Sequence, residues 1–168
     1  LLLLSLAGIA QLNNGGVPWS TAYQIEIQSS FEVFVPPPDM ELINTEDALN
    51  QLPYRFAVNI PVDITLVPQA GRDMTKTSGS STTWHQLSGG KQCLFLSVYA
   101  PGAKAITLYF DKFSVPEGGN LFIYDPEKTV VLGAFTSETN PENGLFATSL
   151  IPGDRLILEY DRQAGMPE

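Results

Sequence analysis

Beyond Tyr54 the chain is built from short runs in which apolar and polar residues alternate, and turns rich in glycine and proline separate these runs. Alternation with a period of two places the apolar side chains on one face of a β-strand, whereas an amphipathic helix has a period of about 3.6. The predicted strands are residues 58–67, 92–99, 104–110, 121–124, 130–135, 145–150 and 155–160, with a further short strand at residues 30–35. This pattern predicts an all-β chain.

The turns between these strands combine proline with glycine. The residues concerned are Pro101 with Gly102, Pro116 with Gly118 and Gly119, and Pro152 with Gly153. Proline fixes the backbone at a corner, and glycine adopts the positive φ that many strand reversals require. We therefore expect these residues to have structural roles.

The short connections between the predicted strands favour antiparallel pairing. Roughly seven or eight strands follow one another about 10 to 15 residues apart, with hardly any helix between them. Parallel strands would need long crossover connections, so an antiparallel β-sandwich of the jelly-roll or CUB-like type is expected at residues 54–160. Pro61 lies inside the first long run and indicates an edge or a bend there.

One short helix is predicted at residues 45–51, inside an N-terminal extension that covers residues 11–53. Asn44 is the expected N-cap, Asp47 lies in the first turn, and Pro53 ends the helix.

The two ends of the sequence differ from the rest in composition. The opening run through Ala10 holds roughly ten apolar residues, about half of what a membrane span needs. Gly8 and Ala10 are small residues at the spacing of a signal-peptidase site, so residues 1–10 are predicted to be part of a signal peptide. The mature protein would then begin near Gln11, without a transmembrane segment, and be secreted, cell-surface or periplasmic. Residues 161–168 are predicted to be a linker to a further, C-terminal domain.

The charge and the rare residue types exclude several classes of function. The sequence has 9 Lys+Arg against 18 Asp+Glu, which gives a formal net charge of −9. An acidic surface does not bind the phosphate backbone of nucleic acids. A single cysteine excludes an internal disulfide, and a single histidine excludes a metal site with several histidine ligands.

The candidate nucleophiles and bases lack partners in the sequence. His85 follows Trp84 at the end of a loop, and no serine lies in a Gly-x-Ser-x-Gly elbow. Cys93 lies in an apolar strand without a cationic neighbour that would lower its pKa. These residues are therefore not expected to form an active site, and no cofactor is expected.

Carboxylates offer a weaker hypothesis, which is calcium binding. The candidates near the helix are Asp39 and Glu41, and those near strand ends are Asp111 and Asp125. Calcium needs six to eight oxygen ligands, roughly, and none of these residues stands in a dedicated calcium-loop spacing. Paired acids could also hydrolyse glycosides, which is the less favoured reading.

Aromatic residues raise the possibility of sugar binding. Most of them fall inside predicted strands, where core packing explains them. Only Trp19, Tyr23 and Trp84 lie in predicted loops, and they are the candidate binding aromatics.

Several motifs together carry a resemblance that covers nearly the whole mature chain. They are Ala100-Pro101-Gly102-Ala103, Tyr109-Phe110-Asp111, Val115-Pro116-Glu117-Gly118-Gly119-Asn120, Leu132-Gly133-Ala134-Phe135, Pro152-Gly153-Asp154 and Leu158-Glu159-Tyr160. The chain resembles the N-terminal, non-catalytic β-sandwich region of secreted trypsin-like serine peptidases of the lysyl-endopeptidase type, especially those of Bacteroidetes. It departs from that family at Leu94-Phe95-Leu96, where a Trp-Arg-Leu-like triplet is usual, and at Ala100, where serine is usual.

The resemblance implies a bacterial polypeptide in which this module precedes a peptidase domain that holds the catalytic residues. The module would act as a pro- or accessory domain in folding, latency or the binding of partners or substrates, and its partner would be the downstream peptidase domain. The alternative is a carbohydrate- or surface-binding β-sandwich of an extracellular protein, with a glycan or a cell-surface protein as its partner. Fold alone does not decide between these functions.

Overall fold

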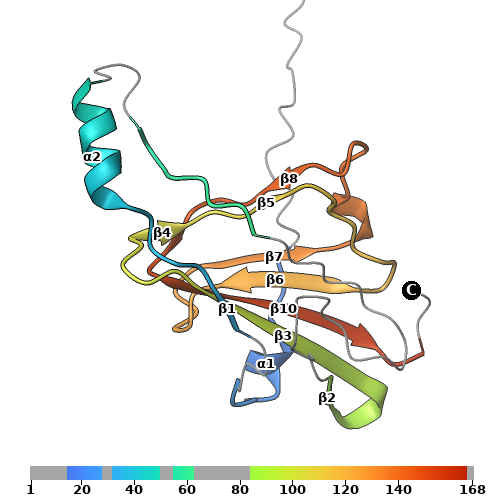
Figure 1. Cartoon of the computed structure of the whole chain (residues 1–168). Coiled ribbons are helices and arrows are strands. Elements are labelled where there is room, and N and C mark those ends of the chain that lie inside the picture. Colours follow the sequence, from blue (N-terminus) through green and yellow to red (C-terminus); the bar gives the residue numbers. More distant parts are fainter. Residues whose placement is uncertain (1–14, 28–31, 50–54, 63–83, 166–168) are drawn as a thin grey trace, which may run out of the picture.

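The structure is a computed structural model that describes residues 15–27, 32–49, 55–62 and 84–165. These residues are mostly β (Figure 1). The strands are β1 (Glu32–Phe34), β2 (His85–Gln86), β3 (Lys91–Tyr99), β4 (Ala105–Ile106), β5 (Tyr109–Phe110), β6 (Asn120–Tyr124), β7 (Val131–Phe135), β8 (Phe146–Ala147), β9 (Ile151–Pro152) and β10 (Arg155–Gln163). The helices are α1 (Trp19–Ala22) and α2 (Met40–Leu49), with short 3₁₀ turns at Ser88–Gly90 and Ser137–Thr139.

The main sheet has six strands and is organised around the long pair β3 and β10. Its order is β1-β3-β10-β6-β7, and β2 pairs with β3 beyond this path. Most neighbours are antiparallel, but β1 runs parallel to β3. The prediction of wholly antiparallel pairing is therefore wrong at this edge, where a long excursion through α2 separates the two strands and permits parallel pairing.

One face of the main sheet packs against two small ladders, β4 with β9 and β5 with β8. Alternation places Leu94, Leu96 and Val98 of β3 on this face, together with Leu156 and Leu158 of β10. The ladders contribute Ile106, Ile151, Phe110 and Phe146 to the same core. Phe113 stacks on Phe146 with ring centroids 4.2 Å apart. Phe146 of β8 also packs against Phe135 of β7, at 5.1 Å between ring centroids, and this contact joins the β5–β8 ladder to the main sheet.

The other face of the main sheet is covered by residues 15–27, which we call the N-terminal strap. Ile25 and Ile27 of the strap pack against a second buried cluster that includes Phe95 and Phe122. The amide of Ala134 in β7 donates to the carbonyl of Gly15 over 2.8 Å. A segment from the start of the chain therefore lies across strands from its far end.

The strand predictions are confirmed where strands are long and buried. Residues 92–99, 121–124, 130–135 and 155–160 all coincide with strands of the main sheet. The predicted strand 104–110 is instead interrupted between β4 and β5, and only short stretches of 145–150 and 30–35 are strand. Residues 58–62 form no strand, and 63–67 lie outside the described residues. The short strand β2 was not predicted.

The helix begins earlier than the sequence pattern indicates. Asp39 is the N-terminal cap of α2, because its Oδ1 accepts the amides of Glu41 and Leu42 over 3.1 and 3.0 Å. The predicted cap Asn44 lies inside the helix, and residues 50 and 51 lie outside the described residues. Within the described part of the chain, no helix has the length and apolar character to cross a membrane.

The predicted linker overlaps the last strand. β10 continues through Gln163, and Asp161 and Arg162 are buried, so the first three residues of the polar run belong to the sheet. Strand pairing with β3 holds these polar residues in the sheet. The predicted signal at residues 1–10 lies outside the described residues, as do residues 166–168.

The glycine turns follow the prediction except at one position. Gly102, Gly118 and Gly153 have positive φ, whereas Gly119 does not. A Cβ at Gly119 would lie 2.2 Å from the hydroxyl and 2.6 Å from the ring of Tyr160. Glycine is therefore required at position 119 by the close approach of a buried ring, and not by a left-handed backbone.

Candidate functional site

Two acidic residues of β10, Glu159 and Asp161, are fully buried beneath the N-terminal strap. They are two positions apart and therefore lie on the same face of the sheet. Glu159 pairs in register with Phe95 and Phe122, and Asp161 pairs with Cys93 on the β3 side. We call Glu159 and Asp161 the buried acid pair. A buried carboxylate is costly unless it is hydrogen-bonded, so its donors define its role.

Glu159 has donors from two elements. Its Oε1 accepts the backbone amide of Ser20 over 2.7 Å, and its Oε2 accepts the Ser20 hydroxyl over 2.5 Å. The Tyr124 hydroxyl of β6 also donates to Oε2. Burial, and then the charge of Glu159, raise the pKa of the Tyr124 hydroxyl, so it remains a donor at every physiological pH.

Asp161 accepts fewer hydrogen bonds than Glu159 does. Its Oδ2 accepts the backbone amide of Trp19 over 3.0 Å, and its Oδ1 has no partner among the described residues. Burial raises the pKa of Asp161 to about 8, and the nearby charge of Glu159 adds to this, while the Trp19 amide and the Lys128 ammonium oppose it. Asp161 is therefore largely protonated at neutral pH.

Lys128 places a cation beside the buried acid pair. Its Nζ donates to Ser20 Oγ over 2.7 Å and to Thr21 Oγ1 over 2.6 Å, and it lies 5.1 Å from the centroid of the Tyr124 ring. Burial lowers the pKa of Lys128, and the attraction of Glu159 and Asp161 opposes that change. The loop between β6 and β7 thus adds a second contact to the strap.

The juxtaposition of Ser20 and Lys128 resembles a nucleophile beside a base, but the contacts argue for a structural role. The Ser20 hydroxyl donates to Glu159 and accepts from Lys128, so its donor and its acceptor sites are both engaged. Ser20 is only 2% exposed, so its hydroxyl lies buried within this network. A general base must reach a proton that the reaction releases, and here the lysine is the donor. The arrangement anchors α1 to the sheet.

The candidate aromatics fall into two places. Trp19 and Tyr23 lie together in the strap, with the Lys91 ammonium 5.1 Å and 5.0 Å from their ring centroids. Trp84 lies elsewhere, against Tyr160 at 6.0 Å between ring centroids. The Arg162 guanidinium covers the Trp84 ring at 4.4 Å. The structure therefore brings together two of the three aromatics.

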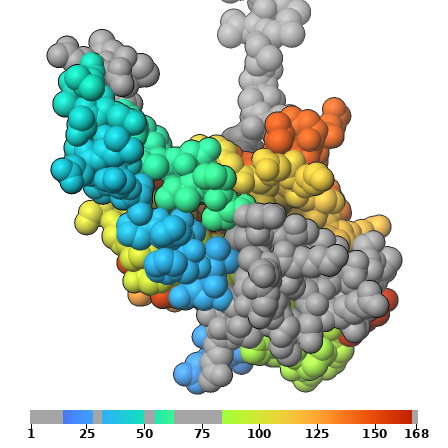
Figure 2. Space-filling model, in the orientation of Figure 1, coloured from blue at the N-terminus to red at the C-terminus, as the bar shows by residue number. Residues whose placement is uncertain are grey.

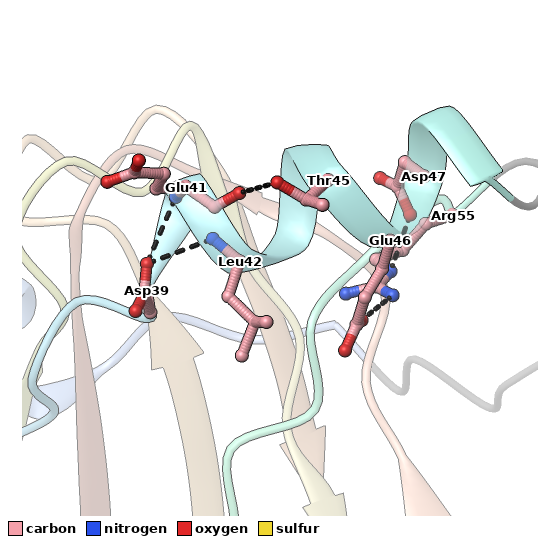
Figure 3. A network of polar contacts seen from close by, with 7 residues as sticks. All are labelled: Asp39, Glu41, Leu42, Thr45, Glu46, Asp47 and Arg55. Atoms are coloured by element: carbon pink, nitrogen blue, oxygen red, sulfur yellow. Dashed lines mark hydrogen bonds and ion pairs between the residues drawn. The ribbon is translucent and has the colours of Figure 1, made fainter.

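The calcium candidates are dispersed. Asp39 caps α2 and Glu41 lies in its first turn (Figure 3). Asp111 is exposed after β5. Asp125 follows β6 and accepts the amides of Thr129 and Val130 over 3.1 and 2.6 Å. Among the described residues no three acidic, histidine or cysteine side chains converge as a metal site would require.

The single histidine and the single cysteine both contact the sheet. His85 lies in β2 with its ring 5.1 Å from that of Phe95. Cys93 is fully buried, and burial, followed by the charges of Asp161 and Glu159, raises the pKa of its thiol to about 12. A thiol in that state is a poor nucleophile.

Sequence reasoning missed the buried acid pair and its partners Ser20 and Lys128. One signal was present, since Glu159 is an acid at an inward position of the apolar run 156–160. An acid at such a position requires a buried donor. Comparison of the chain with protein family models, with curated proteins and with solved structures finds no match.

Proposed function

We propose that the chain is a non-catalytic N-terminal module of a secreted serine endopeptidase of the lysyl-endopeptidase type. The module acts in folding, latency or partner binding, and the catalytic residues belong to a downstream domain. In this proposal the main sheet and the two small ladders are the layers of a jelly-roll or CUB-like β-sandwich. The turn motifs around Pro101, Pro116 and Pro152, shared with such modules, support this interpretation.

The observation that carries the proposal is that residues of the strap donate hydrogen bonds to the buried acid pair. Glu159 and Asp161 are 0% exposed and accept hydrogen bonds from Ser20 and Trp19 of the strap. A carboxylate pair with catalytic duties would face a cleft, where substrate can reach it. Here the pair joins the start of the module to its last strand, which suits a domain whose task is to present a stable surface.

The proposal is tested by reading the coding sequence past codon 168 and by expressing the encoded peptidase domain with and without this module. We expect a trypsin-like set of His, Asp and Ser downstream. We also expect the module, added in trans, to increase the activity recovered after dilution from denaturant or to inhibit the folded peptidase. A downstream region without such a set, or a peptidase that refolds and acts equally well without the module, would contradict the proposal.

A second candidate, carbohydrate binding, is favoured by one observation, the pairing of Trp19 and Tyr23 around Lys91. Tyr23 is 40% exposed, and aromatic rings beside a hydrogen-bond donor suit a sugar ring and its hydroxyls. A glycan array should then show binding that Tyr23→Ala abolishes and Trp84→Ala retains, because Trp84 is covered by Arg162. Binding that neither substitution changes would remove this candidate.

A further inference from the structure

Helix α2 stands away from the sheets, and the segment that returns from it runs back to them, where Ile60 packs against the core (Figures 1 and 2). We call residues 39–49 and 55–62 the α2 arm. Of the ten residues in α2, only Ile43 is buried. A helix of this length is marginal in water by itself, so its contacts with the rest of the arm decide whether it is ordered.

The arm is held by local polar contacts (Figure 3). The Asp39 carboxylate caps the first turn through the amides of Glu41 and Leu42. At the other end, the Arg55 guanidinium contacts Glu46 over 2.6 Å and Asp47 over 3.1 Å. These ion pairs are partly exposed and add little stability, but they fix the returning segment against the helix. The arm therefore presents a defined surface.

The α2 arm exposes several large apolar side chains that lie outside the buried core. Leu42 and Leu49 are 56% and 79% exposed, and Phe56 is 84% exposed. Leu42 and Leu49 are seven residues apart, which places them on the same side of the helix, two turns from each other. Met40 and Val58 are also exposed. Several large exposed apolar side chains gathered on one short arm are typical of an interaction surface.

The charge of the arm restricts what can cover this surface. Residues 39–62 contain four acidic residues, Asp39, Glu41, Glu46 and Asp47, against the single cation Arg55, so the arm has a net charge of −3. A second copy of the chain brings the same −3 arm and the same overall charge of −9. An anionic membrane is repelled for the same reason.

We propose that the α2 arm is the docking surface for a protein partner that presents apolar side chains surrounded by lysine and arginine. Leu42, Leu49 and Phe56 supply the apolar centre, and Glu41 with the Glu46–Asp47 pair supplies the complementary charge. The inference deepens the proposed function, because it rests on the module's role in partner binding and names the surface that performs it.

The test uses the full chain and two synthetic amphipathic peptides with leucines on one face. One peptide carries lysines on its other face, and its counterpart carries glutamates at the same positions. Fluorescence anisotropy should show binding of the lysine peptide that weakens as salt is added, and much weaker binding of the glutamate peptide. The double substitution L42S/L49S should lower the affinity at least about tenfold. The matched control L145S/L150S, which changes two exposed leucines outside the α2 arm, should not.

Equal binding of the two peptides, no binding, or equal losses in both double variants would overturn the proposal. Concentration-dependent dimerisation abolished by L42S/L49S would also overturn it, in favour of a second copy as the occupant. Binding to vesicles of anionic lipid that depends on Leu42 and Leu49 would overturn it in favour of a membrane. No peptidase is present in this assay, so its failure would leave the refolding test of the proposed function unaffected, and a failed refolding test would leave the docking surface standing.

Discussion

The Glu159 carboxylate accepts both the backbone amide and the hydroxyl of Ser20, over 2.7 and 2.5 Å, although 139 positions separate the two residues. Glu159 belongs to the last strand, and Ser20 belongs to the strap that covers the second face of the main sheet. The contact thus joins the two ends of the described chain through a buried carboxyl group. Its loss would leave several donors buried without an acceptor. A buried donor without an acceptor destabilises the folded state by the full free energy of its desolvation.

Glu159→Ala is predicted to be strongly destabilising. The substitution leaves the Ser20 amide, the Ser20 hydroxyl and the Tyr124 hydroxyl without their acceptor. We expect a loss of roughly 3 to 5 kcal/mol in the free energy of unfolding, measured by urea denaturation. Glu127→Ala is the control, because Glu127 is exposed, and it should change that free energy by less than about 0.5 kcal/mol. Similar effects of the two substitutions would show that Glu159 is not an anchor.

Asp161 should make the protein less stable as the pH rises. Its pKa is raised from 3.8 to about 8 on folding, so the folded state holds a proton that the unfolded state has released. The stabilisation is therefore complete below about pH 4 and is lost as the pH rises through about 8. Asp161→Asn removes this titration, while the amide oxygen can still accept from Trp19. Between about pH 5 and pH 8 the free energy of unfolding of the wild type should fall roughly 3 to 4 kcal/mol more than that of the variant.

The groups facing Asp161 define what this comparison must control. Glu159 from the same strand, Lys128 from the β6–β7 loop and Cys93 from β3 all lie within its electrostatic reach. Their side chains are unchanged in Asp161→Asn, so the difference between the two pH profiles reports the titration of Asp161 together with its coupling to these groups. Parallel profiles for the wild type and the variant would show that Asp161 titrates at its ordinary pKa.

Asp125 is predicted to stabilise the β6–β7 connection without binding a metal. Burial alone would raise the pKa of Asp125, but hydrogen bonds from the Val130 and Thr129 amides and the Thr129 hydroxyl lower it. A lowered pKa adds stability above about pH 3.8 that is lost as the pH falls through the folded-state value. Asp125→Ala should cost roughly 2 kcal/mol at neutral pH. Calcium should leave the melting temperature of the wild type unchanged, and a calcium-dependent increase that Asp125→Ala abolishes would refute this account.

Gly119→Ala should destabilise the fold through a clash with Tyr160. The new methyl group would lie 2.2 Å from the Tyr160 hydroxyl, and the ring is buried. Overpacking of this kind costs about 1 to 3 kcal/mol. The loss should be smaller when Gly119→Ala is made in a Tyr160→Leu background, because the ring that clashes is gone. An equal loss in both backgrounds would point to backbone strain as the cause.

The sequence pattern predicted the main sheet better than its surroundings. β3 and the apolar part of β10 alternate with a period of two over long runs, so their strand character follows from local sequence. The small ladders consist of two-residue strands, which are too short to show a period. The start of α2 was misplaced because Asp39 follows three prolines, and a proline-rich stretch suggests extended chain more than a helix cap.

The buried acid pair could not be assembled from the sequence. Asp161 stands at the beginning of a run that is polar and rich in glycine and proline, and only pairing with β3 shows that it belongs to the sheet. Ser20 and Lys128 are 108 positions apart, and each lies in a stretch of sequence whose composition is typical of a loop. Contacts at that separation depend on topology, which local patterns do not encode.

Amide hydrogen exchange of the strap tests most directly whether the buried acid pair anchors the N-terminal strap to the sheet. In the wild type the amides of Trp19 and Ser20 donate to Asp161 and Glu159, and they should be protected. In Glu159→Ala, exchange at Ser20 should accelerate by a larger factor than exchange at Ile123 and Leu158, which pair within the sheet. Rapid exchange at Ser20 in the wild type, or equal acceleration at Ser20 and in the sheet, would contradict the account.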